Sequence, residues 1–320
     1  MSERDILLSV IVPVYNVEPY LAKTLDSLLA AAPDGPMEII AVDDGSADRS
    51  LEILREYEVK TDTVRVIRRE NGGVSRARNT GIEAARGKYI TFADGDDTVL
   101  PGFFAAAIAE MEEHGFDLVQ GNIRYIGDDD KVRMVAPGSP RMESADPAEL
   151  REWFFGQSET LTFNSVAKVY RRSAVGDVRF EPGIRIAEDL QFVFDLLRKN
   201  PRVLILDTDA YDYIERHSSV THTQYVENGW DAIKVLERCE GEETFFRFRK
   251  QIRKLKTNVL VKIYNIATLS GKDAEPALEE IRKFNLTEIR EMMTRKEWAK
   301  LMMLQRCRGV YDCLLRAQKA

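Results

Sequence analysis

The chain has 320 residues, more than one domain usually contains, so we expect one large domain with an appended segment, or two domains. Apolar residues make up 44% and charged residues 31% of the sequence, which excludes a disordered chain, a collagen-like repeat and a disulfide-stapled miniprotein. Residues 1–244 carry 28 basic and 45 acidic side chains (−17), whereas residues 245–320 carry 18 and 8 (+10), giving a net charge of −7. The acidic body excludes duplex nucleic acid as a partner.

The cysteines and the apolar runs indicate a compartment. Three cysteines, all late in the chain, favour reduced thiols and a cytoplasmic location over a secreted disulfide framework: Cys239, Cys307 and Cys313. No window holds the roughly 18 consecutive apolar residues of a membrane helix. The N-terminal run Ile6 to Tyr15 is interrupted by Pro13 and lacks a cleavage site, so we interpret it as a buried strand rather than a signal segment.

Short apolar runs alternate with helical patterns over the first hundred residues. Strands are predicted at residues 7–16, 38–42, 64–67 and 88–93, and helices at residues 21–29, from 50 onward and at 74–85. Strands that alternate with helices in this way predict βαβ units, and therefore an α/β fold with a mostly parallel sheet. In such sheets, ligands bind beyond the carboxyl ends of the strands.

The rest of the chain divides into two parts. Residues 127–144 are rich in Gly, Asp, Pro and Ser and predict a loop. Further strands are predicted at 164–170, 202–206 and 210–214, and a helix at 188–199. Beyond residue 226 the pattern is helical to the end. We therefore expect a Rossmann-like α/β domain of residues 1–225 and a helical domain of residues 226–320.

The segment Asp94-Gly95-Asp96-Asp97 follows the fourth predicted strand and places three carboxylates within four residues. A like-charge pair about 4 Å apart costs on the order of 4 kcal/mol at an effective dielectric near 20. A divalent cation such as Mg²⁺ or Mn²⁺ would relieve that repulsion, and Gly95 would let a ligand approach the backbone closely. The alternative is a solvated turn in which each aspartate caps backbone amides.

A second acidic segment, Asp43-Asp44-Gly45-Ser46, ends the second predicted strand. Aspartate and serine before a helical pattern are typical of helix capping. A carboxylate at the same sheet edge as the first segment is also suited to accept a hydrogen bond from a nucleobase imide.

Three further groups leave two interpretations open. Arg76 and Arg78 with Asn79 either form a solvated face or bind phosphate at a helix start. Glu188 and Asp189 either cap a helix or include a general base near a bound sugar. The aromatic run Trp153 to Phe155 favours a core role over a platform for a sugar face. Two histidines, His217 and His222, do not form a zinc site, but one could assist a metal or a pyrophosphate.

This ordered series of motifs over residues 8–105 resembles the family 2 glycosyltransferases with the GT-A fold, of the type that builds bacterial cell-surface polysaccharides. The likeness does not extend beyond about residue 226. The segments that carry it are Ser9–Asn16, Val42–Ser50, Asn71–Gly81, Gly87–Asp97, Lys168–Arg172 and Ala187–Leu190.

The resemblance implies inverting, metal-dependent transfer of a sugar from a nucleotide sugar, a UDP-sugar first of all, to a hydroxyl of a glycan or lipid-linked acceptor. It also implies a role for each matched position. Nucleobase contacts would come from Pro13, Tyr15, Asp44 and Asp43; Arg76 would hold the donor; Asp94 and Asp96 would hold Mn²⁺ or Mg²⁺ on the diphosphate; Asp189, or Glu188 beside it, would be the base.

Two other functions compete with this one. Asp94 to Thr98 also fits the DxDxT pattern of haloacid-dehalogenase-like phosphatases, in which the first aspartate is a nucleophile. Here three strand–helix units precede that motif, which normally ends the first strand of its domain. The other alternative is a non-catalytic carbohydrate-binding protein on the same scaffold.

The basic C-terminal part offers one further hypothesis. Residues 251–256 are rich in Lys and Arg and precede an apolar stripe of Val259, Leu260, Ile263 and Tyr264. This pattern is typical of a helix packed on the catalytic domain or on a second copy of the chain. It also fits peripheral contact with the anionic inner face of a membrane, next to a lipid-linked acceptor.

Overall fold

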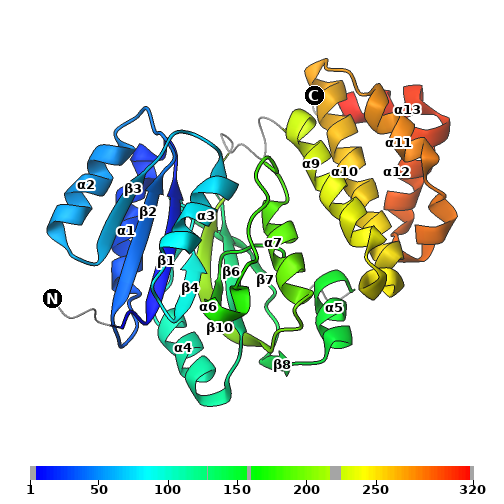
Figure 1. The fold of residues 1–320 in the computed structure, drawn as a ribbon. Helices are drawn as coiled ribbons and strands as arrows, with labels where there is room; N and C mark the ends of the chain where they lie inside the picture. The colour runs from blue at the N-terminus through cyan, green and yellow to red at the C-terminus, as the bar shows by residue number, and fades with distance from the viewer. Residues whose placement is uncertain (1–4, 128, 157–159, 217–224, 318–320) are drawn as a thin grey trace. The chain divides into compact units, whose positions relative to one another are not determined.

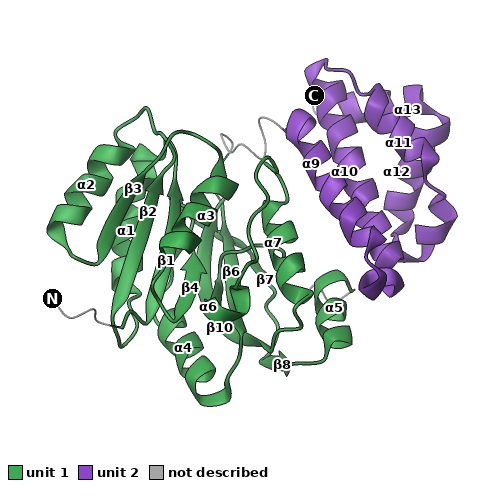
Figure 2. Ribbon diagram, viewed as in Figure 1, with its two compact units in different colours: residues 1–217 green, residues 218–320 purple. Residues whose placement is uncertain are grey.

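The computed structural model describes residues 5–127, 129–156, 160–216 and 225–317. The chain forms two compact units, residues 1–217 (unit 1) and 218–320 (unit 2), shown in separate colours in Figure 2. The boundary that the sequence predicts after residue 225 lies eight residues beyond this division.

Unit 1 is built on one mixed ten-stranded sheet (Figure 1). The strand order is β3-β2-β1-β4-β9-β6-β10-β5, with β7 on β6 and β8 on β10. The strands are β1 (Leu8–Val14), β2 (Met37–Asp43), β3 (Val64–Arg68), β4 (Tyr89–Phe92), β5 (Thr98–Val99), β6 (Leu118–Ile126), β7 (Val132–Ala136), β8 (Met142–Ser144), β9 (Lys168–Arg171) and β10 (Val203–Ile214).

The direction of the strands decides which loops meet. Strands β3, β2, β1 and β4 are parallel, and β6 is parallel to β10. Because β9 is antiparallel to both β4 and β6, those two strands run the same way. The carboxyl ends of β1, β2, β4, β6 and β10 therefore lie along one edge of the sheet, which we call the carboxyl edge.

The sequence explains why β1 and β2 occupy the middle of this half. Every residue of β2 is buried, as are six of the seven residues of β1, which is typical of parallel strands covered on both faces. Ser9 and Glu38 are the polar exceptions at the start of these strands, and the Ser9 hydroxyl donates to Glu38 at 2.7 Å.

Helices cover the sheet of unit 1. Helix α3 packs on β1 and β2, and α4 packs on β6, β9 and β10. Gly81 of α3 permits a close approach, because a Cβ at this position would lie 2.3 Å from Cγ2 of Ile11. The helices are α1 (Glu18–Ala30), α2 (Ser50–Lys60), α3 (Val74–Ala84), α4 (Phe103–His114), α5 (Pro147–Phe155), α6 (Arg172–Val175) and α7 (Glu188–Leu197).

An aromatic cluster fixes α7 against the sheet. Phe192 of α7 stacks on Phe180, with centroids 4.2 Å apart and planes at 5°. Phe92 of β4 meets both rings edge-on at 5.2–5.5 Å, and Tyr170 of β9 meets Phe92 and Phe192 in the same way. All four side chains are buried, so the start of α7 is held beside the end of β4.

The element predictions hold except around residues 127–144, 164–167 and 202–214. The strand predicted at 164–170 begins only at Lys168. The predicted loop at 127–144 contains β7 and β8, whose residues are mostly exposed or half-buried. Both strands are short and are flanked by the Gly, Asp, Pro and Ser residues that predict a loop. The strands predicted at 202–206 and 210–214 are one strand, β10, interrupted by register shifts between Ile205 and Tyr211.

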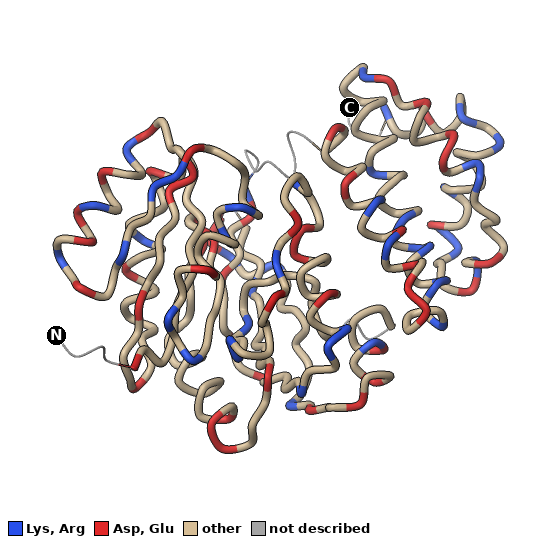
Figure 3. Tube along the Cα trace, viewed as in Figure 1, with Lys and Arg blue, Asp and Glu red and all other residues tan. Residues whose placement is uncertain are grey.

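Unit 2 is helical. Its central helix α10 contacts α9, α11, α13 and both 3₁₀ segments. Basic and acidic side chains both occur along these helices (Figure 3). The elements are α9 (Tyr225–Gly241), η1 (Glu243–Phe248), α10 (Arg249–Ser270), α11 (Glu275–Lys283), η2 (Leu286–Met292), α12 (Arg295–Arg306) and α13 (Arg308–Ala317).

The apolar stripe of α10 is internal to unit 2. Leu260, Ile263 and Tyr264 are at most 2% exposed, and the Tyr264 hydroxyl donates to Asp312 of α13 at 2.7 Å. The hypothesis of membrane contact is therefore wrong for Leu260, Ile263 and Tyr264, which are buried within unit 2, whereas peripheral contact through the basic residues 251–256 stays a prediction.

We expect Phe192→Ala to lower the free energy of unfolding by about 3–5 kcal/mol, because it leaves a cavity among three packed rings. Urea unfolding measures the change. The matched control is Phe246→Ala, which removes a ring that is 62% exposed and should change stability by about 0.5 kcal/mol or less. Equal effects of the two substitutions would contradict the packing described.

Candidate active site

The acidic segments predicted from the sequence meet at the carboxyl edge around the end of β1. The amide of Asp44, which follows β2, donates to the carbonyl of Val14 at 2.8 Å. Gly95, which follows β4, lies so close that a Cβ there would be 3.3 Å from the carbonyl oxygen of Pro13. The turn Asp94–Asp97 (the DGDD turn) and the Asp44 loop therefore flank the same strand end.

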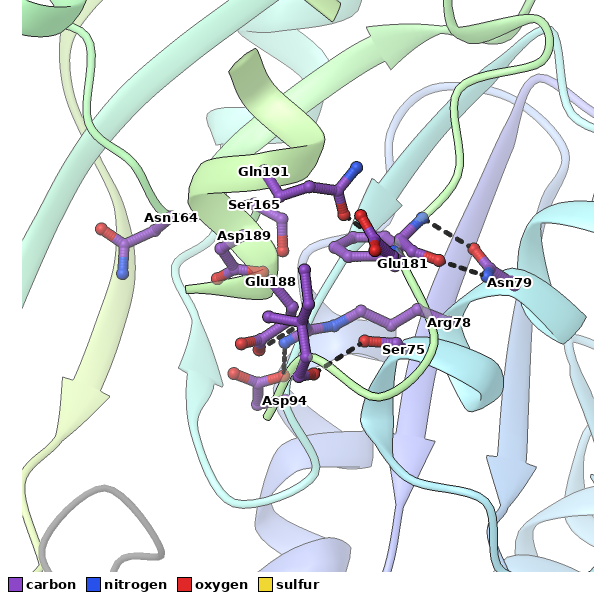
Figure 4. A network of polar contacts seen from close by, with 12 residues as sticks. Ser75, Arg78, Asn79, Asp94, Asn164, Ser165, Glu181, Glu188, Asp189 and Gln191 are labelled. Atoms are coloured by element: carbon purple, nitrogen blue, oxygen red, sulfur yellow. Dashed lines mark hydrogen bonds and ion pairs between the residues drawn. The ribbon is translucent and has the colours of Figure 1, made fainter. Parts of the chain in front are cut away.

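One buried guanidinium joins the DGDD turn to the start of α7 (Figure 4). Arg78 of α3 donates from Nη2 to Asp94 Oδ1 at 2.8 Å, and from Nη1 to Glu188 Oε1 at 3.0 Å and Asp189 Oδ1 at 2.8 Å. Its side chain is 3% exposed, whereas the three carboxylates are 15–30% exposed. The carboxylates thus face both Arg78 and the solvent.

Arg78 and its three carboxylate partners shift one another's pKa values. Burial alone would lower the pKa of Arg78, but the three carboxylates outweigh it and hold that pKa well above its usual value. Burial, and next the charge of Asp189, raise the pKa of Glu188 to about 7. With three carboxylates on one cation, the group keeps an excess of negative charge.

The loop that precedes α7 is held by α3 and by α7 itself (Figure 4). Asn79 donates to the carbonyl of Phe180 at 2.8 Å and accepts from its amide at 3.0 Å. Ser75 donates to the carbonyl of Ile184 at 3.3 Å, and Gln191 accepts from the amide of Glu181 at 2.7 Å. These contacts fix where α7 begins, and with it Glu188 and Asp189.

The remaining aspartates of the DGDD turn have different partners. Asp97 is buried and accepts from the Tyr211 hydroxyl and the Ile214 amide, both at 2.9 Å. Asp96 accepts from Nη1 of Arg216 at 2.9 Å, and that guanidinium lies 3.9 Å from the centroid of the Tyr20 ring. Burial, and then neighbouring aspartates, raise the pKa of Asp96 and Asp97. Asp97 therefore supports the fold, whereas Asp96 stays partly exposed.

The donor set of the turn fits a hard divalent cation. Magnesium in proteins is usually held by one or two carboxylates together with substrate phosphates, and Asp94 and Asp96 supply two partly exposed carboxylates. Burial, and then the charge of Asp94, raise the pKa of Asp96, and a cation between the two carboxylates would offset their repulsion. Among the described residues, no group of three or more His, Cys, Asp or Glu side chains is placed so that it could hold a metal ion, so the two aspartates would depend on the substrate phosphates for further ligands.

Asp43 and Asp44 have different hydrogen-bond partners, and therefore different roles. Asp43 is buried and accepts from the amide of Ser46 at 3.1 Å, which is the turn-capping alternative. Asp44 accepts from the amides of Gly72 at 3.1 Å and Gly73 at 2.7 Å, and from Arg69. Asp44 therefore fixes the Gly72-Gly73 loop in front of α3, and Gly73 has a φ of +89° there.

Three of the expected nucleotide contacts lie at the surface of this edge. Tyr15 is 51% exposed, just beyond β1, and Pro13 is half-buried. Arg76 is exposed in the first turn of α3. Arg78 does not share this position, so the solvated-face interpretation is wrong for Arg78, because its side chain turns inward to the carboxylates.

Other predictions have clear outcomes. The capping interpretation of Glu188 and Asp189 is not what the structure shows, since both carboxylates accept from Arg78. Trp153, Phe154 and Phe155 are at most 4% exposed and belong to the core, so the sugar-platform alternative is wrong for them. His217 and His222 lie outside the described residues.

The sequence analysis did not single out Lys168, which the structure places among the buried residues close to the site. Its side chain is fully buried at the start of β9 and donates to Thr162 Oγ1 at 2.7 Å and to the carbonyl of Asn164 at 2.6 Å. Burial lowers the pKa of Lys168 to about 7, although the charge of Asp189 opposes the shift. A lysine inside the apolar run of a predicted strand was the available signal.

No helix within the described part of the chain has the length and apolarity required to cross a membrane.

Comparison with known proteins identifies relatives. The family model described as "Glycosyl transferase family 2" matches residues 9–179. The protein named uncharacterized glycosyltransferase EpsJ of Bacillus subtilis is 39% identical over 222 residues, 68% of this chain and 64% of EpsJ. Glycosyltransferase GlyG of Streptococcus pneumoniae is 30% identical over 249 residues, 74% of this chain and 80% of GlyG. The chain thus spans slightly less than two thirds of EpsJ.

A solved structure shares the fold. The crystal structure of S. aureus TarS 1–349 in complex with UDP superposes with a TM-score of 0.64 at 22% identity, covering 97% of this chain and 89% of that one. The complex of the same protein with UDP-GlcNAc gives 0.62 at 21% identity, covering 82% and 81%. The likeness confirms the predicted α/β fold with C-terminal helices.

We expect the free energy of unfolding to rise more steeply, or to fall less, between pH 7 and pH 9 in the wild type than in Lys168→Met. Above pH 7 the folded chain increasingly releases the Lys168 proton, whereas in the unfolded chain the lysine has a pKa near 10.5 and still binds it. Lys168 therefore makes the free energy of unfolding increase with pH, by at most about 1.4 kcal/mol per pH unit. Urea unfolding of both proteins at both pH values measures the difference. Identical slopes for the two proteins would show that Lys168 keeps an ordinary pKa.

Proposed function

This chain belongs to glycosyl transferase family 2, and on that premise we propose that it transfers a sugar, with inversion, from a UDP-sugar to a hydroxyl of a glycan or lipid-linked acceptor. In this proposal, the transfer is a step in the synthesis of a cell-surface polysaccharide. Unit 1 carries the chemistry in this proposal, and unit 2 is a separate helical domain.

One observation carries the proposal. Carboxylates of the DGDD turn and of α7 face each other across Arg78 at the carboxyl edge of the sheet. The DGDD side suits a cation and a diphosphate, whereas the α7 side supplies carboxylates for a base. Sugar transfer from a nucleotide diphosphate needs both, on different sides of the reacting carbon.

The donor has a place along the same edge. Tyr15 and Pro13 border the nucleobase, and Asp44 fixes the loop beside it. Arg76, at the exposed start of α3, meets the diphosphate together with the helix N-terminus. Asp94 and Asp96 would hold Mn²⁺ or Mg²⁺, which when bound neutralises the charge of the leaving diphosphate.

The transfer itself follows from these positions. Asp189 takes the proton of the acceptor hydroxyl, whose oxygen forms a bond to the anomeric carbon. The bond from that carbon to the diphosphate oxygen breaks on the opposite face, so the configuration inverts. Arg78 fixes the Asp189 carboxylate at 2.8 Å, and a positioned base of this kind accelerates transfer by about 10²–10⁴-fold.

The identity of the donor rests on the relatives. TarS is described in complex with UDP and with UDP-GlcNAc, and S. aureus TarS, 29% identical to this chain over 209 residues, is named poly(ribitol-phosphate) beta-N-acetylglucosaminyltransferase. These names support a UDP-sugar, with UDP-GlcNAc as the first donor to test. They also support an acceptor in the cell envelope.

The competing functions have less support. A DxDxT phosphatase would need Asp94 as a nucleophile, but Asp94 is paired with Arg78, and the family model covers the motif together with the strands before it. A non-catalytic carbohydrate-binding role would leave the full set of carboxylates without a use, and the experiment below separates it from catalysis.

We expect Asp189→Asn to lower kcat for transfer by about 10²-fold or more while UDP-sugar binding stays unchanged, because the base is lost and the donor contacts remain. Enzyme assays with UDP-GlcNAc and isothermal titration measure the two quantities. The matched variant Glu188→Gln tests which neighbour is the base. Full activity of Asp189→Asn together with loss in Glu188→Gln would reassign the role.

We expect Asp96→Ala to lose both Mn²⁺ binding and Mn²⁺-dependent donor binding, since it removes a carboxylate from the proposed cation site. Titration of each variant with UDP-GlcNAc, with Mn²⁺ or with EDTA, checks this. A tight donor complex of Asp96→Ala in EDTA would contradict the metal assignment.

A further inference from the structure

Two half-buried tyrosines lie at the carboxyl edge beyond the DGDD turn. Tyr125 is the penultimate residue of β6 and Tyr213 that of β10, and the two residues are paired in the parallel register of these strands. Residues opposite each other in parallel strands point to the same face of the sheet. Their ring centroids are 5.4 Å apart, with planes at 52°.

Tyr125 and Tyr213 lie on the face of the sheet from which Tyr211 reaches the DGDD turn. Tyr211 precedes Tyr213 by two residues, so both side chains point to one face. The Tyr211 hydroxyl donates to Asp97 at 2.9 Å and accepts from the amide of Asp94 at 3.0 Å. Tyr213 is near enough to the DGDD turn for the charges of all three aspartates to act on its phenol.

The sheet order places this pair on the side away from the donor. The nucleobase contacts lie beside β1 and β2, the DGDD turn follows β4, and β6 and β10 lie on the far side of β4 (Figure 1). A molecule that approaches the reacting carbon from the β6–β10 side meets the two tyrosine rings before the carboxylates.

We propose that Tyr125 and Tyr213 form an aromatic platform for a sugar ring of the acceptor, and that the acceptor is an uncharged glycan rather than a polyol phosphate. This inference rests on the proposed function. Aromatic side chains combine an apolar face with a polar hydroxyl, which suits a pyranose that presents C–H groups on its face and hydroxyls at its rim. The role that the sequence left open for residues 153–155 thus falls to these two tyrosines.

Among the described residues, the charges around the pair disfavour a polyanion. The carboxylate of Glu215 acts on Tyr125. The aspartates of the DGDD turn do not add to this charge in the loaded enzyme, because Asp94 and Asp96 would hold the cation. Neighbouring cations have carboxylate partners: Arg124 pairs with Asp212 and Asp209, and Lys131 and Arg133 pair with Asp129. A phosphate of the acceptor would have to compete with these carboxylates for the described cations, whereas sugar hydroxyls can donate to the carboxylates.

The experiment compares acceptors and variants of the full chain. Wild type, Tyr125→Ala, Tyr213→Ala and Tyr213→Phe are assayed with UDP-GlcNAc and Mn²⁺, or with the sugar nucleotide that wild type hydrolyses fastest. Acceptors are uncharged oligosaccharides and, in parallel, ribitol-phosphate and glycerol-phosphate oligomers. The control is Phe246→Ala, which removes an exposed ring from unit 2. UDP affinity is measured by titration for every variant.

We expect wild type to use an oligosaccharide and not the polyol phosphates. Both alanine variants should raise KM for the oligosaccharide by about tenfold or more, with UDP affinity retained, while Tyr213→Phe and Phe246→Ala keep KM near the wild-type value. Unchanged KM in both alanine variants, or preference for a polyol phosphate, would overturn the inference. A wild type that neither hydrolyses nor transfers any sugar nucleotide would instead contradict the proposed function itself.

Discussion

The ion-pair group around Arg78 is the interaction on which the rest of the site depends. A single buried guanidinium contacts Asp94 at the end of β4 and two carboxylates at the start of α7, 16, 110 and 111 residues away in sequence. Removing Arg78 would leave three carboxylates crowded without a counter-charge, which is strongly unfavourable in a partly buried place. Arg78 therefore holds together the side of the site that suits a diphosphate and the side that supplies a base.

This arrangement gives each part of the carboxyl edge a separate task. The β1–β2 end offers exposed Tyr15 and Arg76 beside a loop fixed by Asp44. The DGDD turn concentrates negative charge that a cation can neutralise. The β6–β10 end adds aromatic surface at Tyr125 and Tyr213. Because all these strands run in one direction, residues from distant parts of the chain reach the same edge.

The sequence predicted the strands of the parallel half because they are short, mostly apolar runs, two of which lead directly into Asp43 and Asp94. Strand direction alone then predicted that Asp44 and the DGDD turn would share an edge. The inward turn of Arg78 was not predictable, because its neighbour Arg76 has the same side chain at an exposed position of the same helix. Strands β7 and β8 escaped prediction since exposed edge strands carry no buried face, and Lys168 gains its partners from a loop that only tertiary structure brings near.

The most direct test of the central claim is a double-mutant cycle on the free energy of unfolding with Arg78→Met and Asp189→Asn. If the two side chains form the ion pair described, the double variant should depart from the sum of the single variants by about 1 kcal/mol or more. The account predicts that Asp189→Asn costs less, or even stabilises, once Arg78 is gone. Additive effects within about 0.5 kcal/mol would contradict it, because Arg78 would then not join the carboxylates of α7 to the DGDD turn.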